Sequence, residues 1–158
     1  MALEIERKFL VKGEFRQDAF SSTGMKQGYI CSAHGRTVRV RIAGERAYLT
    51  IKGPSDESGL SRFEWEKEIG VEEAEELFLL AGPGIIEKTR HYIHAGDGIH
   101  TWEVDEFHGE NEGLVVAEIE LRTPEDTFQK PSWLGEEVTG DHRYSNSSLS
   151  RNPYRSWD

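Results

Sequence analysis

The sequence is poor in cysteine and lacks a long apolar run. It has one cysteine, Cys31, among 158 residues, so an intrachain disulfide is excluded and a reducing, cytoplasmic location is expected. No apolar stretch approaches the ~20 residues of a membrane-spanning helix, and the first residues are charged without the apolar core of a signal peptide. The apolar share of 36 % excludes a disordered or a collagen-like chain.

Positive charge is scarce over the chain as a whole. Nineteen lysines and arginines stand against 29 aspartates and glutamates, which gives a net charge of −10. A net negative surface argues against nucleic acid as a partner, although it does not exclude a local basic site. The length predicts a single domain over residues 1–158, with a core large enough to fold without disulfides.

Three segments have the pattern of amphipathic helices. Val71–Ala81 has an acidic first turn, and Gly82-Pro83-Gly84 predicts its end. Phe15–Ser22 and Ser132–Val138 are expected to form two shorter helices.

Strands are the most informative elements, because residues two apart in a strand share a face. Val38, Val40 and Ile42, for example, alternate with Arg39 and Arg41. Seven segments show this design of one apolar face and one ionisable face: Leu3–Val11, Thr37–Ile42, Tyr48–Lys52, Arg62–Ile69, Glu87–Ile93, Thr101–Phe107 and Val115–Arg122.

The charged faces are separated by sign from strand to strand. An ordinary antiparallel sheet with its charged face in water usually mixes signs, since like charges on neighbouring positions repel. If the strands close into a barrel, these faces line its interior. The cations would then be Lys8, Arg39, Arg41, Lys52, Arg62, Lys88, Arg90 and Arg122. The carboxylates would be Glu4, Glu6, Glu64, Glu66, Glu103, Asp105, Glu118 and Glu120. A barrel of about eight strands is just wide enough for a slim ligand.

Such an interior suits phosphate chemistry. Buried charges are costly unless they are paired or meet a charged ligand, and the planar fork of arginine matches phosphate. Carboxylates two apart, as in Glu4/Glu6 and Glu118/Glu120, offer hard oxygen ligands that select Mg²⁺, Mn²⁺ or Ca²⁺. Clustered cations beside a metal-binding carboxylate set are the groups that phosphoryl transfer needs.

The segment Glu4-Ile5-Glu6-Arg7-Lys8 resembles the ExExK signature of the CYTH superfamily, the triphosphate tunnel metalloenzymes. Further matches follow in order along the chain: Arg39-x-Arg41, Lys52, Arg62-x-Glu64-x-Glu66, Lys88-x-Arg90, Asp105, Glu118-x-Glu120 and Tyr144-Ser145-Asn146-Ser147-x-Leu149. The resemblance implies an α+β, mainly antiparallel fold: a closed eight-stranded β-barrel that forms a tunnel, with helices packed outside.

The resemblance also implies roles for individual residues. The triphosphate would be bound by Lys8, Arg39, Arg41, Lys52, Lys88 and Arg90, with Tyr29 as a wall residue. The divalent metal would be bound by Glu4, Glu6, Asp105, Glu118 and Glu120. Catalysis would depend on Glu4, Glu6, Lys8 and Lys52. Glu64 and Glu66 would hold basic residues in place or contribute to a second metal, while Arg62 and Arg122 would be structural partners.

The expected function is hydrolysis of tripolyphosphate, dependent on Mg²⁺ or Mn²⁺. A class IV type adenylyl cyclase and a thiamine or nucleoside triphosphatase remain as alternatives on the same fold. A polyphosphate-binding module without catalysis is the alternative from another class. A homodimer is also expected.

Overall fold

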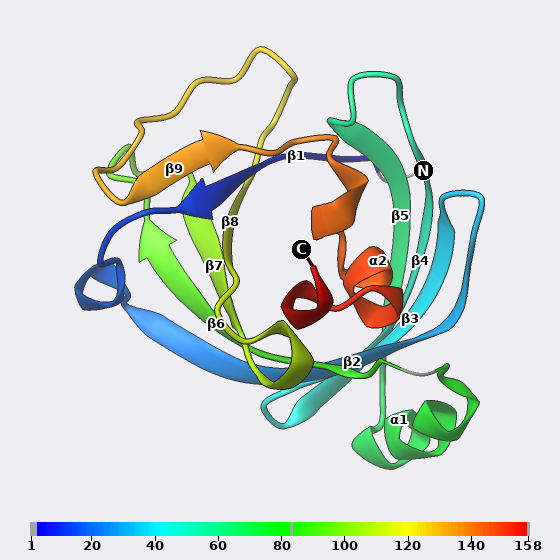
Figure 1. Ribbon diagram of the computed structural model, residues 1–158. Coiled ribbons are helices and arrows are strands. Elements are labelled where there is room, and N and C mark those ends of the chain that lie inside the picture. Colours follow the sequence, from blue (N-terminus) through cyan, green and yellow to red (C-terminus); the bar gives the residue numbers. More distant parts are fainter. Residues whose placement is uncertain (1–2, 83, 158) are drawn as a thin grey trace.

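A computed structural model describes residues 3–82 and 84–157. Over these residues the strands are β1 (Leu3–Val11), β2 (Ser21–Ala33), β3 (Arg36–Ala43), β4 (Arg46–Ser55), β5 (Ser61–Ile69), β6 (Ile86–His94), β7 (Thr101–Phe107), β8 (Val115–Glu120) and β9 (Leu134–Glu137). They form one sheet in the order β5-β4-β3-β2-β6-β7-β8-β1-β9. Pairing between β5 and β1 closes eight strands into a barrel, and β9 adds an extra strand along β1 (Figure 1). The predicted eight-stranded antiparallel barrel is confirmed.

Each of the seven predicted strands is a strand of the barrel, with its ends shifted by at most three residues. Apolar residues on the face of these strands opposite the charged one point outward and are covered from outside. On β1, β7 and β8 the largest outer cluster contains Phe9, Trp102 and Ile119. The segment that follows β8 covers this cluster with Trp133, whose ring centroid lies 5.6 Å from that of Trp102.

The helical elements are short. They are α1 (Val71–Leu77), α2 (Asn146–Arg151) and the 3₁₀ turns η1 (Arg16–Asp18), η2 (Phe78–Leu80), η3 (Gly109–Asn111), η4 (His142–Tyr144) and η5 (Tyr154–Ser156). No helix among the described residues has the length and apolar character needed to span a bilayer.

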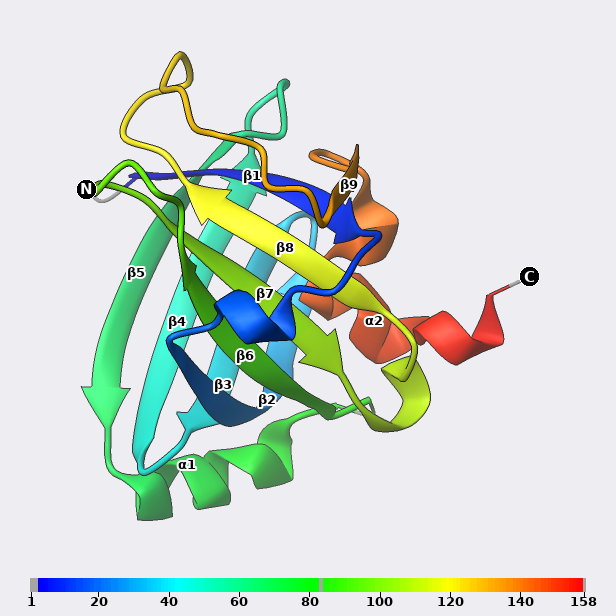
Figure 2. The ribbon, with the colours of Figure 1, turned by 90° about the vertical axis from the view of Figure 1, so that its left-hand side faces the viewer.

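The helix predicted over Val71–Ala81 is confirmed as α1 continued by η2, packed outside the barrel (Figure 2). Ala74 is fully buried against Val40 and Ala47 of the outer barrel face. A Cβ on Gly28 of β2 would come within 2.8 Å of Ile85 Cδ1, so glycine permits the close approach of the segment after η2. The predicted stop at Pro83 lies outside the described residues.

The helix predicted over Phe15–Ser22 is wrong. The structure has only the single turn η1 there, and β2 begins at Ser21. Phe15 is buried because it packs edge-on against His91 and Trp133. Its apolar character therefore belongs to the outer cluster and not to a helix face.

The helix predicted over Ser132–Val138 is also wrong, because this segment contains β9. Phe9 and Val11 of β1 pair with Glu137 and Leu134. A Cβ on Gly135 would lie 2.9 Å from the carbonyl oxygen of Leu10. Pairing with an available strand edge thus overrides the local helical pattern.

The C-terminal segment takes a place different from that of α1. It lies at one end of the barrel, over the opening seen along the barrel axis (Figures 1 and 2). Leu149 of α2 is buried among residues on the inner face of the barrel strands, including Ile86, Phe107 and Val116. The helices expected outside are thus represented by α1, whereas α2 fills part of the barrel end.

Candidate active site

A cavity of about 240 Å³ lies inside the barrel. Six cations, seven carboxylates and six other polar residues line it: Lys8, Arg39, Arg41, Lys52, Arg62 and Arg90; Glu4, Glu6, Glu64, Glu66, Glu103, Glu118 and Glu120; Tyr29, Thr37, Thr50, Ser145, Asn146 and Ser147. The volume is slightly smaller than the ~300–1,000 Å³ typical of sites for drug-sized ligands. A small and strongly charged ligand therefore fits it best.

Carboxylates gather on one side of the cavity, which we call the acidic wall: Glu4 and Glu6 of β1, Glu103 of β7, and Glu118 and Glu120 of β8. The strand register places Glu6 directly opposite Glu120 and Glu103 directly opposite Glu118. Lys8 is the cation on this side, with Nζ 3.7 Å from Glu118 Oε1. Like charges in direct cross-strand register destabilise a sheet. A cation bound at the acidic wall would offset this repulsion.

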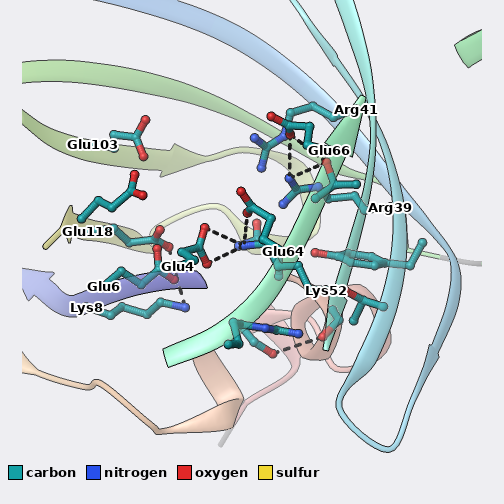
Figure 3. A pocket seen from close by; sticks show the side chains of 18 of the residues that line it. Glu4, Glu6, Lys8, Arg39, Arg41, Lys52, Glu64, Glu66, Glu103 and Glu118 are labelled. Atoms are coloured by element: carbon teal, nitrogen blue, oxygen red, sulfur yellow. Dashed lines mark hydrogen bonds and ion pairs between the residues drawn. The ribbon is translucent and has the colours of Figure 1, made fainter. Parts of the chain in front are cut away.

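Arginines gather in what we call the basic wall: Arg39 and Arg41 of β3 and Arg90 of β6. Arg90 lies where the two walls meet, with Nη1 3.4 Å from Glu103 Oε1. Figure 3 shows Arg39 and Arg41 on the side away from Glu4, Glu6 and Glu118. Burial and then the charges of Arg39 and Arg90 lower the pKa of Arg41 to about 9, which leaves it protonated at neutral pH. Because the positive charges of these three guanidinium groups repel one another, an anion bound between them would be stabilised.

Polar side chains from neighbouring strands hold the basic wall in place. The Nε of Arg41 donates to Gln27 Oε1 at 2.9 Å. Arg39 donates from Nη2 to Thr50 Oγ1 at 3.2 Å, and Thr50 in turn donates to Glu66 at 2.8 Å. The Nε of Arg39 is buried without a hydrogen-bond partner among the described residues. An unpaired buried donor costs about 1–3 kcal/mol, which an anionic ligand would offset.

Lys52 connects the acidic wall with β5. Its Nζ donates to Glu4 Oε1 at 2.9 Å and lies 3.3 Å from Glu64 Oε2. Burial opposes ionisation of Glu4, but the Lys52 charge and the hydrogen bonds with Glu64 and Lys52 together outweigh it and lower the Glu4 pKa. Burial and then the neighbouring Glu4 raise the pKa of Glu64 to about 7.

Asp105 and Lys88 lie behind the cavity lining. Asp105 accepts from Arg90 Nε at 2.7 Å and Nη2 at 2.9 Å, and from Lys88 Nζ at 2.7 Å. Lys88 also donates to Asn146 Oδ1 of α2 at 3.0 Å. Burial lowers the pKa of Lys88 to about 7, against the opposing charge of Asp105. With these contacts, Asp105 holds two cations in place, and this geometry differs from the metal ligation expected for it.

The remaining predicted residues divide between the cavity and the surface. Tyr29 lines the cavity, and Arg62 reaches it while donating to the carbonyls of Gly53 and Gly35 at 2.9 and 3.0 Å. Arg122, expected in the interior, lies beyond the end of β8 and pairs with Asp126 at 2.9 Å. Its interior placement was wrong because the strand stops at Glu120.

Ser145, Asn146 and Ser147 were part of the C-terminal motif, but the sequence assigned them no role in the site. The lining residues Thr37 and Thr50 and the buried partner of Arg41, Gln27, were not singled out. Thr50 alternates with Lys52, which was a usable signal. The position of Gln27 could not be predicted from the sequence, because β2 has glycines and polar residues in place of a regular apolar face.

The acidic wall fits a divalent cation by the chemistry of its donors. Burial raises the pKa of Glu6 well above its usual value, and the charges of Glu118 and Glu4 add to this rise. Burial also opposes ionisation of Glu118, but the charges of Lys8, Arg90 and Lys88 together lower its pKa to about 2. Across residues 3–82 and 84–157, no three such groups are already gathered at ligand distances. The carboxylates Glu4, Glu6, Glu118 and Glu120 are the residues that would hold the ion.

Comparisons with known proteins agree with this geometry. The CYTH domain family matches residues 2–153. An inorganic triphosphatase of Acetivibrio thermocellus is 49 % identical over 158 residues, covering 99 % of both chains. One of Nitrosomonas europaea is 36 % identical over 150 residues, covering 93 % of this chain and 96 % of its own. The crystal structure of an inorganic triphosphatase matches with a TM-score of 0.67 and 32 % identity, over 92 % of this chain and 96 % of that one. The chain therefore belongs to the CYTH domain family.

Proposed function

We propose that the protein is an inorganic triphosphatase that hydrolyses tripolyphosphate with Mg²⁺ or Mn²⁺. The observation that carries the proposal is the division of one small polar cavity into a basic and an acidic wall. Tripolyphosphate is a slim polyanion that binds divalent cations, so it presents the charges that these walls complement. The names of the relatives from Acetivibrio thermocellus and Nitrosomonas europaea support the same activity.

The cations of the cavity have the task of binding the phosphate chain. Arg39, Arg41 and Arg90 would contact its oxygens from the basic wall, while Lys8 and Lys52 would contact it from the other strands. The three arginines are held by hydrogen bonds to Thr50, Gln27 and Asp105, respectively, before any ligand binds. Preorganised charges of this kind stabilise a transition state without further rearrangement. Asp105 supports Arg90 from behind and holds Lys88 with the same carboxylate.

Hydrolysis converts tripolyphosphate and water into orthophosphate and pyrophosphate. The water oxygen bonds to a terminal phosphorus while the bond from that phosphorus to the bridging oxygen breaks. The bridging oxygen leaves as part of pyrophosphate, and the water protons go to the products and the solvent. Glu4, Glu6, Glu118 and Glu120 would hold a divalent cation, which supplies charge neutralisation at the phosphate oxygens when bound.

The lining gives little support to substrates with an organic group. Tyr29 is the one aromatic side chain among the residues that line the cavity. A nucleotide or thiamine ring gains much of its affinity from apolar and aromatic contacts. This argues for the inorganic substrate over a cyclase or a nucleoside or thiamine triphosphatase, and the complete set of acidic-wall residues argues for catalysis over binding alone.

Phosphate release from tripolyphosphate, ATP and thiamine triphosphate, each with Mg²⁺, Mn²⁺ or Ca²⁺, tests the proposal. We expect strong release from tripolyphosphate with Mg²⁺ or Mn²⁺. Pyrophosphate together with cyclic AMP from ATP would reassign the protein as a cyclase. Binding of tripolyphosphate without turnover under any of these ions would leave a binding module. Lys8→Ala or Glu6→Ala with full activity would overturn the assignment of the site.

Two accompanying proposals concern the setting of the protein. A cytoplasmic location fits the single, exposed Cys31, and fractionation of the source cell tests it. A homodimer is proposed on the commonness of twofold assemblies, and light scattering of the purified protein distinguishes it from a monomer.

A further inference from the structure

Arg7 belongs to the Glu4–Lys8 motif but points to the opposite side of β1 from the cavity. Its guanidinium donates two hydrogen bonds to the carboxylate of Glu137, from Nε at 2.8 Å and from Nη2 at 2.6 Å. Its Cζ lies 5.5 Å from the ring centroid of Phe9 and 5.1 Å from that of Phe128. The proposed reaction gives this residue no contact with the substrate.

A chain of hydrogen bonds connects the Arg7–Glu137 pair with the backbone of Lys8 at the edge of β1. Glu137 Oε2 accepts a hydrogen bond from the Thr139 hydroxyl at 2.7 Å. Thr139 Oγ1 accepts one from the backbone N–H of Lys8 at 2.9 Å. The carbonyl of Lys8 accepts from the N–H of Val138 at 2.8 Å. Both backbone polar groups of Lys8 are therefore held by residues 138–139.

These contacts replace strand pairing that β1 lacks at this point. β1 pairs with β5 over Leu3–Ile5 and with β9 at Phe9 and Val11, so among the described residues the contacts with residues 138–139 fill the stretch of its edge between these two pairings. The Lys8 side chain is a flexible four-carbon stem, and within residues 3–82 and 84–157 its ammonium makes one ion pair, with Glu118 at 3.7 Å. The position of its backbone therefore determines where the ammonium can reach in the cavity.

We propose that Arg7, Glu137 and Thr139 are positioning residues that set the place of the Lys8 ammonium. This inference rests on the proposed function, because Lys8 has a catalytic task only if the cavity holds a triphosphate. A partly exposed Arg–Glu pair adds little to stability by itself. The role of the Arg7–Glu137 pair is to orient the Glu137 carboxylate, which accepts the hydrogen bond of the Thr139 hydroxyl.

The paired variants Thr139→Val and Thr139→Ser test the inference most directly. Valine keeps the shape but removes the hydroxyl, whereas serine keeps the hydroxyl. We expect Thr139→Val to lower kcat for tripolyphosphate about tenfold with KM nearly unchanged, since a small displacement of a charged group acts on the transition state. Thr139→Ser should stay within about twofold of wild type. Equal losses in both variants, or no loss in either, would overturn the inference.

Glu137→Gln tests the contact between Arg7 and Glu137, and Glu68→Gln is its matched control. Glu68 makes a similar two-bond contact with Arg46, at 3.1 and 2.5 Å, but neither residue lines the cavity. We expect Glu137→Gln to lower kcat severalfold, whereas Glu68→Gln leaves it unchanged. Melting temperatures of both variants show whether each is fully folded at the assay temperature. A similar loss of kcat in both would indicate a general effect on the fold.

A double-mutant cycle separates positioning from a purely structural role. In a Lys8→Ala background, Thr139→Val should cost less than about twofold further, because the group it positions is absent. A full additional tenfold loss would contradict the inference. Calorimetric binding of tripolyphosphate to wild type and Thr139→Val keeps the two proposals apart. A wild type that neither binds nor hydrolyses tripolyphosphate overturns both, whereas an active wild type with an indistinguishable Thr139→Val overturns the positioning role alone.

Discussion

Arg90 contacts Asp105 through two parallel hydrogen bonds of 2.7 and 2.9 Å, and Asp105 is only 2 % exposed. The same carboxylate accepts from Lys88, so one buried negative charge serves two buried cations. Burial opposes ionisation of Asp105, but Arg90 and Lys88 hold its pKa well below the usual range. The carboxylate therefore stays ionised at any pH at which the protein would be assayed.

Asp105→Asn should destabilise the protein strongly. It removes the carboxylate that two buried cations share, although Arg90 keeps its contact with Glu103 at 3.4 Å, and breaking a buried pair costs about 3–5 kcal/mol. For a chain of this size, the fall in melting temperature is about 10 °C or more. Glu14→Gln is the control, because it removes the exposed contact with Arg16 at 3.3 Å. Equal melting temperatures for Asp105→Asn and wild type would contradict the support that Asp105 gives to the basic wall.

Glu6→Gln should stabilise the protein in the absence of divalent metal. It replaces a carboxyl whose ionisation is opposed by burial and by the charges of Glu118 and Glu4 with a neutral amide. Relief of such a pair contributes up to about 1 kcal/mol, so the melting temperature in EDTA should rise by roughly 2–4 °C. The same variant should lose most of the stabilisation that Mg²⁺ or Mn²⁺ gives to wild type. A variant that melts at a lower temperature in EDTA would show that Glu6 is held by favourable contacts instead.

Arg41→Lys should weaken hydrolysis although it keeps the positive charge. Lysine cannot keep the Nε contact with Gln27 while presenting a planar fork to phosphate. The loss of one charge-assisted hydrogen bond, about 1.5–3 kcal/mol, corresponds to a roughly 10- to 150-fold fall in kcat/KM. Steady-state kinetics with tripolyphosphate measure it, and the exposed Arg46→Lys serves as control. An unchanged kcat/KM would remove Arg41 from the substrate contacts.

His100 predicts a dependence of stability on pH. Its two ring nitrogens face acceptor oxygens of Asp97 and Asp126, so both nitrogens donate only when the ring is protonated. The hydrogen bond to Asp97 and then that to Asp126 raise the pKa of His100. Because the folded pKa is raised, the stabilisation is complete below about pH 6.5, the unfolded value, and is lost as the pH rises through the folded value.

The difference in melting temperature between wild type and His100→Gln, measured from pH 5 to pH 9, checks this dependence. The difference should be largest at the acidic end and shrink as the pH rises. His34→Gln removes an exposed histidine with no such carboxylate contacts and should show no trend. A difference that grows with pH would reverse the assigned sign.

The barrel and most of its interior charges were predictable from the sequence. In a strand with one apolar and one charged face, the alternation indicates which face points outward and which face lines the interior. Leu3–Val11 and Thr101–Phe107 were predicted with their observed bounds. Strand β2 was not predicted, since its outer face needs Gly28 for close packing and its inner face offers Gln27 and Tyr29 instead of paired charges.

Contacts between distant segments account for the remaining differences. Ser132–Val138 is a strand because the edge of β1 is available to it. Asp105 alternates with Glu103 in the sequence, yet Lys88 and Arg90 engage it behind the cavity lining. Asn146 reaches Lys88 only because α2 enters the barrel end. None of these relationships has a signal at short sequence separation.

The two walls of the cavity give its interior an electric field directed from Arg39 and Arg41 of β3 toward the carboxylates of β1 and β8. A bare phosphate chain is attracted by one end of this field and repelled by the other. A chain that carries a divalent cation along one edge is a dipole, and it gains at both ends when it lies in a single orientation. The barrel therefore selects for the arrangement of charge within its ligand, and the edge that carries the cation determines which way round the chain lies.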